Sequence, residues 1–434
     1  MVQLAVILPL HEYLSWTGEK HSMLQELSDG LTSFYDSSIK SLVRWHPSLK
    51  NDLDHSEEQK SEMVMDSWYL HHPLLNLARL ALRGDRMAKK LFLDSIDYAI
   101  KVARHFNYKW PVFYKMTTLE VLKAETAPGK GGEKDVPGSY AHVMLLAWQL
   151  TKEKRFLLEA HRALKSLDGL AFGIFYQANN TAFAAGAFLE MYKVTDDKRY
   201  LELSYCCLAG LFKNCQLWDC NYGYGKNFPY FFSVFPLKDA PYTAAYEELE
   251  VFAALHHYLE AAAGIAILPS LNILIPEFIK YATGRLAYYY PPLLPEEMIA
   301  QKTKTGEIQK DLWVPLEDIH DGWEKSGEVG QEVYGAGLAF GIIPRQYFKV
   351  GNLGGTVFIN YPISNFRVGK NSITFRLEGS ALLRAQMRLL DFSKEILTKI
   401  RVQQKVNSSY KPVNELSIGL YELIGDGIVR IKIS

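Results

Sequence analysis

The sequence predicts a mainly α-helical protein built from helical hairpins, with a small antiparallel β domain at its C-terminal end. Three observations lead to this prediction. Polar helix starts recur before almost wholly apolar helices, and short charged turns follow several of those helices. Alternation typical of strands then replaces the helical period after about residue 345. A chain of 434 residues is long enough to bury the core that such an arrangement requires.

The recurrent helix starts define the expected inner helices. Each start is rich in Tyr, Trp, His, Asn or Glu, and the helix that follows is apolar on every face, so it has to be buried. We expect the polar starts to gather at one end of the helical assembly, where they can hold a ligand. The five starts are residues 66–73, 136–142, 176–181, 241–248 and 330–335.

Short charged turns separate apolar helices from amphipathic ones, as in a helical hairpin with its buried helix first. Three turns at similar spacing favour a repeat architecture. The turns are residues 83–86, 152–155 and 196–199, and the amphipathic helices are expected at 91–106, 156–170 and 200–211. A fourth hairpin is expected over 242–289, a fifth begins at 331–340, and residues 23–43 offer a further helix.

Three long connections and a change of texture complete the organisation. The connections cover residues 107–138, 214–241 and 290–330; the second is far too aromatic for disorder. Short strands are expected at 356–360, 372–377, 415–420 and 428–433. We therefore expect an N-terminal segment at 1–19, a helical domain at 20–345 and an antiparallel β domain at 346–434.

Composition excludes several classes of partner. The formal net charge is +0 with no basic stripe, so we expect no nucleic acid. Residues 1–10 are apolar but too short to span a membrane and lack the basic start of a signal peptide. We expect no membrane partner and a cytoplasmic protein, or else a natural start upstream of Met1. The sequence does not indicate an oligomeric state.

Four cysteines lie close together in the sequence, but their spacing contains no C-x2-C pair. Buried small side chains are the favoured interpretation, with zinc binding left open. We expect no metal and no organic cofactor. The cysteines are Cys206, Cys207, Cys215 and Cys220.

Over residues 68–340, the hairpins and their polar starts resemble the six-hairpin glycosidase-like (α/α) toroid superfamily. Segments 180–183 and 198–201 are similar to phrases found in many toroid enzymes. The resemblance implies an incomplete (α/α) toroid of about five to six helical hairpins, followed by a C-terminal antiparallel β-sandwich. It also implies a carbohydrate substrate and an enzyme of glycoside hydrolase, polysaccharide lyase or epimerase type. No single family motif matches, so no catalytic residue is transferred.

The leading functional hypothesis is acid/base cleavage of a glycoside or an acidic polysaccharide, in a cleft at the inner-helix starts. A hydrolase needs two carboxyl groups across the scissile bond. A lyase or epimerase instead needs a base, often Tyr or His, and a group that neutralises the substrate carboxylate. The alternative is a non-catalytic glycan-binding or scaffold protein on the same fold.

The catalytic candidates begin with Glu248, Glu332 and Glu247, which lie on otherwise apolar inner helices. Burial raises the pKa of a carboxyl group, as a general acid requires. The alternative is that these residues pair with arginines or cap neighbouring helices. Asp219, beside a Trp in the aromatic connection, and Tyr334, a candidate for proton transfer, complete the set. Turn and packing roles are their alternatives.

The substrate-binding candidates are aromatic, imidazole or amide side chains at the helix starts or in the aromatic connection. Aromatic rings can stack on sugar faces and amides can bind hydroxyls, although packing and helix capping explain some of them as well. For His71, packing or capping is the favoured alternative. The candidates are Trp68, His71, Tyr140, Gln177, Asn179, Trp218 and Tyr222.

Overall fold

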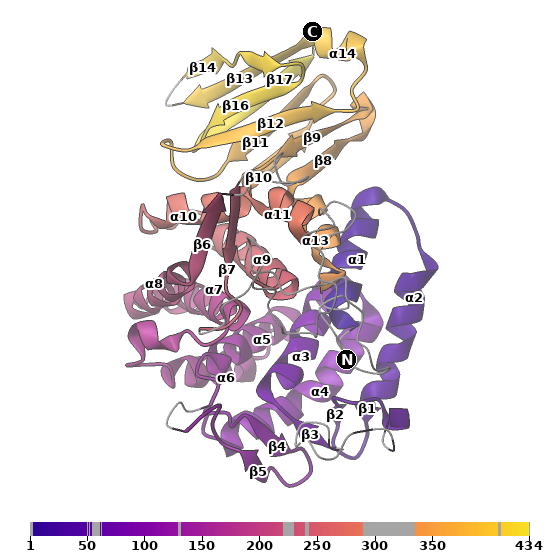
Figure 1. Ribbon diagram of the computed structural model, residues 1–434, viewed down its shortest axis with the longest axis vertical. Coiled ribbons are helices and arrows are strands. Elements are labelled where there is room, and N and C mark those ends of the chain that lie inside the picture. Colours follow the sequence, from indigo (N-terminus) through magenta and orange to yellow (C-terminus); the bar gives the residue numbers. More distant parts are fainter. Residues whose placement is uncertain are drawn as a thin grey trace.

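The computed structural model describes residues 3–49, 51, 53, 61, 63–128, 132–219, 230–238, 243–289, 335–406 and 409–433. Within these residues, helices form a ring and the C-terminal strands form two packed sheets beside it (Figure 1). The predicted fold class, hairpins of an (α/α) toroid followed by an antiparallel β-sandwich, is confirmed, but the described inner helices close the toroid that was expected to be incomplete.

Six of the described helices form the inner ring. In chain order, each packs against the next, and the last packs against the first, so the ring is closed. They are α1 (Leu4–Thr17), α3 (Ser67–Leu82), α5 (Val136–Thr151), α7 (Ala178–Thr195), α9 (Ala245–Ala261) and α13 (Leu338–Gln346). Helix α1 comes from the segment 1–19 that the sequence set apart from the helical domain. It is buried along most of its length, as an inner helix must be.

Outer helices cover the ring. The predicted turns are confirmed, but α4 and α8 begin earlier than expected because Asp85 and Asp197 cap them: each side chain accepts a hydrogen bond from a backbone N–H of the first turn. The helix expected within 23–43 is limited to α2, after which β1 pairs with β2. The outer helices are α2 (Ser22–Asp29), α4 (Arg86–His105), α6 (Lys154–Lys165), α8 (Lys198–Lys213), α10 (Leu271–Lys280) and α11 (Ala282–Tyr289).

Small sheets occupy two of the long connections. The first connection contributes two strands to a three-stranded sheet, and the second contributes a two-stranded hairpin. The described strands that precede the C-terminal domain are β1 (Tyr35–Asp36), β2 (Ser41–Leu42), β3 (Val64–Met65), β4 (Phe113–Lys115), β5 (Val121–Lys123), β6 (Cys215–Asp219) and β7 (Tyr230–Val234). The connection 290–330 lies outside the described residues.

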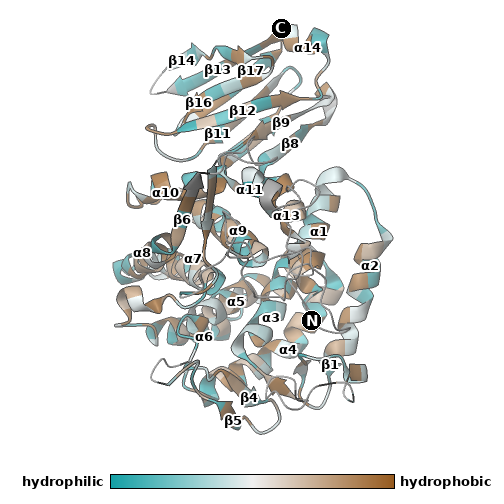
Figure 2. Cartoon of the chain, in the orientation of Figure 1, coloured by the Kyte–Doolittle hydropathy of each residue, from teal (hydrophilic) through white to brown (hydrophobic). Residues whose placement is uncertain are grey.

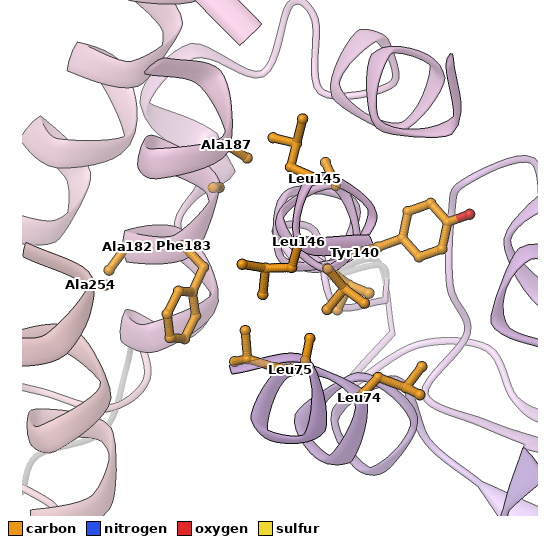
Figure 3. Packing of buried hydrophobic residues seen from close by; sticks show 14 of the residues in the cluster. Leu74, Leu75, Tyr140, Leu145, Leu146, Ala182, Phe183, Ala187 and Ala254 are labelled. Carbon is orange, nitrogen blue, oxygen red and sulfur yellow. The ribbon is translucent and has the colours of Figure 1, made fainter. Parts of the chain in front are cut away.

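The inner helices approach one another closely where small residues face each other. A Cβ added to Gly138 of α5 would lie 2.2 Å from the Cβ of Ala184 on α7, so only glycine permits this contact. Figure 3 shows Leu75, Leu146 and Phe183 gathered between α3, α5 and α7. This packing fixes the inner starts beside one another.

The C-terminal domain consists of two five-stranded antiparallel sheets, in the orders β10-β11-β17-β13-β14 and β15-β16-β12-β9-β8. Apolar and polar residues alternate along strands such as β12, as Figure 2 shows, because one face of each sheet is buried. The elements are β8 (Tyr347–Val350), β9 (Gly355–Ile359), β10 (Ile363–Val368), β11 (Ser372–Leu377), β12 (Arg384–Leu390), α14 (Lys394–Lys399), β13 (Ile400–Val406), β14 (Ser409–Pro412), β15 (Glu415–Ser417), β16 (Leu420–Ile424) and β17 (Gly427–Ile433).

The strand expected at 415–420 is wrong in one respect, since the chain turns within it. Gly419 has a φ of 72°, a left-handed conformation that favours glycine, and separates β15 from β16. A Cβ there would also lie 2.9 Å from the carbonyl oxygen of Leu389. The turn therefore divides the segment that was expected to be one strand into two antiparallel strands, β15 and β16.

Candidate functional site

The starts of four inner helices meet at one end of the ring. Tyr246 of α9 reaches His72 of α3, with 2.5 Å between the hydroxyl and Nδ1. Gln177, the residue before α7, donates its amide to Glu247 of α9. The gathering of polar starts expected from the sequence is therefore present among the described residues.

A narrow cavity of about 10 Å³ lies between these starts, room for about one water molecule. Trp68 forms one wall and stacks on His72 with 4.4 Å between ring centroids. Asn179 and Asn180 line the opposite side, and the Asn180 amide donates to the Gln177 side chain over 3.3 Å. Aromatic and amide groups thus face each other across the cavity.

Glu247 stands at this end as a half-buried residue whose Oε2 atom is buried. Its Oε1 accepts a hydrogen bond from the Gln177 amide at 3.4 Å, and its Oε2 has no partner within the part of the chain that the structure describes. Burial raises the pKa of Glu247 to about 7, with the Gln177 hydrogen bond opposing that rise. At neutral pH the group is therefore poised to give or take a proton.

Like Glu247, the next residue, Glu248, does not line the cavity. Its carboxylate binds the buried guanidinium of Arg285 and accepts hydrogen bonds from Ser233 at 2.8 Å and Tyr289 at 3.1 Å. Burial raises its pKa, while Arg285 opposes the rise. These contacts favour the ion-pair alternative, in which Glu248 ties α9 to β7 and α11.

A group of acidic residues beside the starts of α3 and α7 was not singled out in the sequence. Asp135 accepts hydrogen bonds from the backbone N–H of Gln177 at 2.7 Å and from the Thr181 hydroxyl at 2.6 Å. Burial raises the pKa of Asp135 to about 6. Its position just before an inner helix is that of a helix cap, the one sequence feature that could have indicated it.

Glu133 lies next to Asp135 and accepts a hydrogen bond from Ser67. Burial raises the pKa of Glu133 well above its ordinary value, and the nearby carboxyl groups of Asp66 and Asp135 raise it further. Asp66 caps α3 through the Tyr69 backbone N–H. Burial and the two neighbouring carboxyl groups therefore favour the protonated form of Glu133.

His71 lines the cavity, whereas Tyr140 lies in the core beside it. The His71 ring packs against the rings of Trp110 and Tyr140, and burial lowers its pKa to about 3. The Tyr140 hydroxyl donates to Glu159 of α6 at 3.3 Å, on the side away from Phe183 (Figure 3). Burial raises the Tyr140 pKa well above its ordinary value. These contacts favour the packing alternative for His71 and for Tyr140.

Several predicted site residues are not placed. Glu332, Tyr334 and Tyr222 lie outside the described residues, as do the side chains of Asp219 and Trp218, whose backbone forms part of β6. The structure therefore leaves these five as predictions.

The described cysteines do not form a metal site. Cys206, Cys207 and Cys215 are free thiols, while Cys220 lies outside the described part of the chain. No group of three or more His, Cys, Asp or Glu side chains among the described residues has the arrangement of a metal site. No described helix is long and apolar enough to cross a membrane.

No protein-family model matches the sequence, and no curated protein matches it. Among solved structures, the chain is similar to a family 76 glycoside hydrolase (mannosidase) from Bacteroides thetaiotaomicron. The identity is 10% and the TM-score 0.46, over 79% of this chain and 84% of that one. It is also similar to a family 127 β-L-arabinofuranosidase from Geobacillus stearothermophilus, with 10% identity and a TM-score of 0.44 over 100% of this chain and 72% of that one. A third similar structure is cellobiose 2-epimerase from Spirochaeta thermophila, with 12% identity and a TM-score of 0.45 over 79% of this chain and 85% of that one. Similarity at this level identifies no activity, so function has to be inferred from the side chains.

Proposed function

We propose that the protein is a carbohydrate-active enzyme, a glycoside hydrolase that uses Glu247 as its general acid. The observation that carries this proposal is the position of Glu247 at the inner-helix starts, with one oxygen on Gln177 and the other without a partner among the described residues. A carboxyl group with a pKa near 7 is half protonated at neutral pH and can donate a proton to a leaving sugar.

The side chains at the helix starts offer groups that suit a sugar, although the cavity there has room for about one water molecule and Glu250, not Glu247, is the carboxylate that lines it. The stacked pair of Trp68 and His72 offers a flat apolar face, and the side-chain amides of Asn179 and Asn180 offer donors and acceptors for hydroxyl groups. Asp135 holds the backbone of Gln177, which in turn holds Glu247. Asp135 thereby acts as a positioning residue for the proposed acid.

Hydrolysis also requires a second carboxyl group, about 5–10 Å from the acid. Two residues are candidates in this proposal. Glu332 precedes α13, the sixth inner helix, and Glu133 stands beside the start of α3. Burial and the neighbouring carboxyl groups raise the pKa of Glu133, so Glu332 is our first choice for the ionised partner.

The contacts of Tyr140 favour hydrolase over lyase chemistry. A lyase base has to reach a substrate proton, but the Tyr140 hydroxyl is bound to Glu159, and Tyr140 does not line the cavity. His71 does line it, with both ring nitrogens unpartnered among the described residues, so only Tyr140 is excluded as a base on these grounds.

The test compares leaving groups in the variant Glu247→Gln. On glycosides with a sugar leaving group, found by screening neutral and uronic substrates, we expect turnover to fall by about 100-fold or more, because the leaving oxygen is no longer protonated. On dinitrophenyl glycosides the same variant should retain most of its turnover, because dinitrophenolate leaves without a proton. The control Glu202→Gln, an exposed position on α8, should match the wild type on both.

Equal loss on both substrate types would contradict the role of Glu247 as acid. Products with the ultraviolet absorbance of an unsaturated uronide would show a lyase and overturn the hydrolase proposal. Glu248→Gln is a further comparison, because it leaves Arg285 without its carboxylate and should lower the stability of the fold instead.

A further inference from the structure

A second cavity, of about 500 Å³, opens at the opposite end of the ring, where the inner helices finish. Its wall is formed by the C-terminal parts of α1, α3, α5, α9 and α13. Polar side chains dominate it: Glu12, Arg83, Gln149, His256, Glu260 and Arg345. The proposed catalytic residues do not contribute to this cavity.

The two cavities are separated by a partition across the ring. Arg79 lines the C-terminal cavity, Glu250 lines the cavity at the helix starts, and the two form an ion pair. The Arg79 guanidinium also lies 5.1 Å from the centroid of the Phe183 ring, which contacts both spaces. A ligand in the C-terminal cavity would therefore be distinct from a substrate at the helix starts.

The cavity has an exposed mouth and a buried floor. At the mouth, the Arg83 side chain is 42% exposed and Glu260 is exposed. At the floor, His142 is only 5% exposed, and its Nδ1 has no hydrogen-bond partner in the described residues. The Nε of Arg79 is likewise buried without one. Buried polar atoms are normally satisfied, so these two indicate a missing partner inside the cavity.

Charge indicates what kind of partner is missing. Both oxygens of Glu12 are occupied, by Arg83 on one and by Arg345 on both. Glu250 is similarly occupied by Arg79. Three guanidinium groups, those of Arg79, Arg83 and Arg345, therefore line the cavity against the carboxylates of Glu12 and Glu260, while Glu250 lies across the partition. The buried Nε of Arg79 is a spare N–H donor, and Glu260 is exposed at the mouth. The imidazoles do not reverse this balance, because burial lowers the pKa of both His142 and His257.

We propose that the C-terminal cavity binds a small molecule bearing a carboxylate or phosphate group. Arg83 and Arg79 would hold the anion by charge-assisted hydrogen bonds, and His142 would bind a polar group of the same molecule at the floor. Arginines near helix C-termini also offset the helix dipoles, but that role does not require them to face a cavity. This inference does not rest on the proposed hydrolase activity.

The test is calorimetric titration of the full chain with inorganic phosphate, glucuronate, glucose 6-phosphate and glucose. We expect at least one anion to bind and glucose to bind at least tenfold more weakly, with affinity falling as salt is raised. Two variants should each weaken that anion at least tenfold. Arg83→Gln removes a charge at the mouth, and Ala253→Leu fills space in the wall.

Controls separate this site from the one at the helix starts. Arg86→Gln removes an exposed charge three residues further on and should leave anion binding unchanged, and so should Glu247→Gln. Thermal unfolding of each variant checks that it remains folded. If no anion binds, if glucose binds as tightly as the anions, or if Arg83→Gln and Ala253→Leu bind normally, the proposal is wrong.

Discussion

Glu247 and Glu248 show how far one residue step changes a side chain's role. Successive residues of an α-helix point about 100° apart, so the two carboxyl groups face different neighbours. Glu247 meets the amide of Gln177 at the helix starts, whereas Glu248 meets Arg285 behind α9. Both lie in the first turn of one apolar helix, and burial raises the pKa of each. The difference between the two residues therefore lies in their partners: a neutral amide beside Glu247, the proposed proton donor, and a guanidinium beside Glu248, which forms an ion pair.

The raised pKa of Glu247 predicts a pH dependence. A general acid works in its protonated form, so kcat/KM should fall as the pH rises through about 7, and Glu247→Gln should lack this fall.

The stability of the fold should also depend on the protonation of Glu247. Because the folded state holds the proton more tightly than the unfolded state, the free energy of unfolding should decrease as the pH rises from the ordinary glutamate value to about 7. That contribution should be absent in Glu247→Gln, as measured by urea unfolding across this range. A rate that increases through pH 7 would make Glu247 a base.

At the scale of elements, helix α1 decides whether the ring closes. It packs between α3 and α13, and its Glu12 binds arginines near the ends of both neighbours. The contact with α13 is close at Gly337, where an added Cβ would lie 2.6 Å from Cγ of Pro9 and 2.7 Å from the carbonyl oxygen of Ala5.

Gly337→Ala should therefore open the seam between α1 and α13. We expect the free energy of unfolding to fall by about 1–3 kcal/mol, because a backbone atom cannot move aside as a flexible side chain can. The control is Gly30→Ala, at a helix end with a φ of −65° and no atom within 4 Å of the added Cβ. Equal denaturation midpoints for the two variants would show that α1 does not hold the ring closed.

At the scale of the whole molecule, the ring and the β-sandwich have separate hydrophobic cores. A polar contact joins them. The buried side chain of Gln346 donates to the carbonyl of Ile279 at 3.0 Å and to that of Asn360 at 3.2 Å, which links α10 to the β domain (Figure 1). We propose that the domain boundary lies here, close to the change of pattern at residue 345, and that residues 4–17 belong to the helical domain.

Gln346→Met should weaken this junction. It keeps the length of the side chain but leaves the two carbonyl groups without their donor, so we expect a loss of about 1–3 kcal/mol. Thermal unfolding followed by calorimetry measures it. The exposed Gln386→Met on β12 is the matched control and should change little. An unchanged profile for Gln346→Met would place the coupling of the two domains elsewhere.

The sequence by itself determined the fold class, the turns at 83–86, 152–155 and 196–199, and the gathering of the inner starts. These depend on local patterns, since an all-apolar helix has to be buried and a charged turn has to be exposed. Periodicity shows which helices are buried but not which distant side chain each buried group will meet.

Only the tertiary structure decided which helix completes the ring and which carboxyl groups are paired. A charged turn, with Glu19 and Lys20, follows helix α1, but α1 is not among the helices with a recurrent polar start, and it is recognised by its contacts with α3 and α13. The partners of Glu248 and Asp135, Arg285 and the start of α7, come from other elements. The C-terminal cavity likewise exists only because inner helices from distant parts of the chain end around one space. The pKa of a buried group and the hydrogen-bond partners available to it depend on such neighbours. The closure of the ring determines which residues those neighbours are.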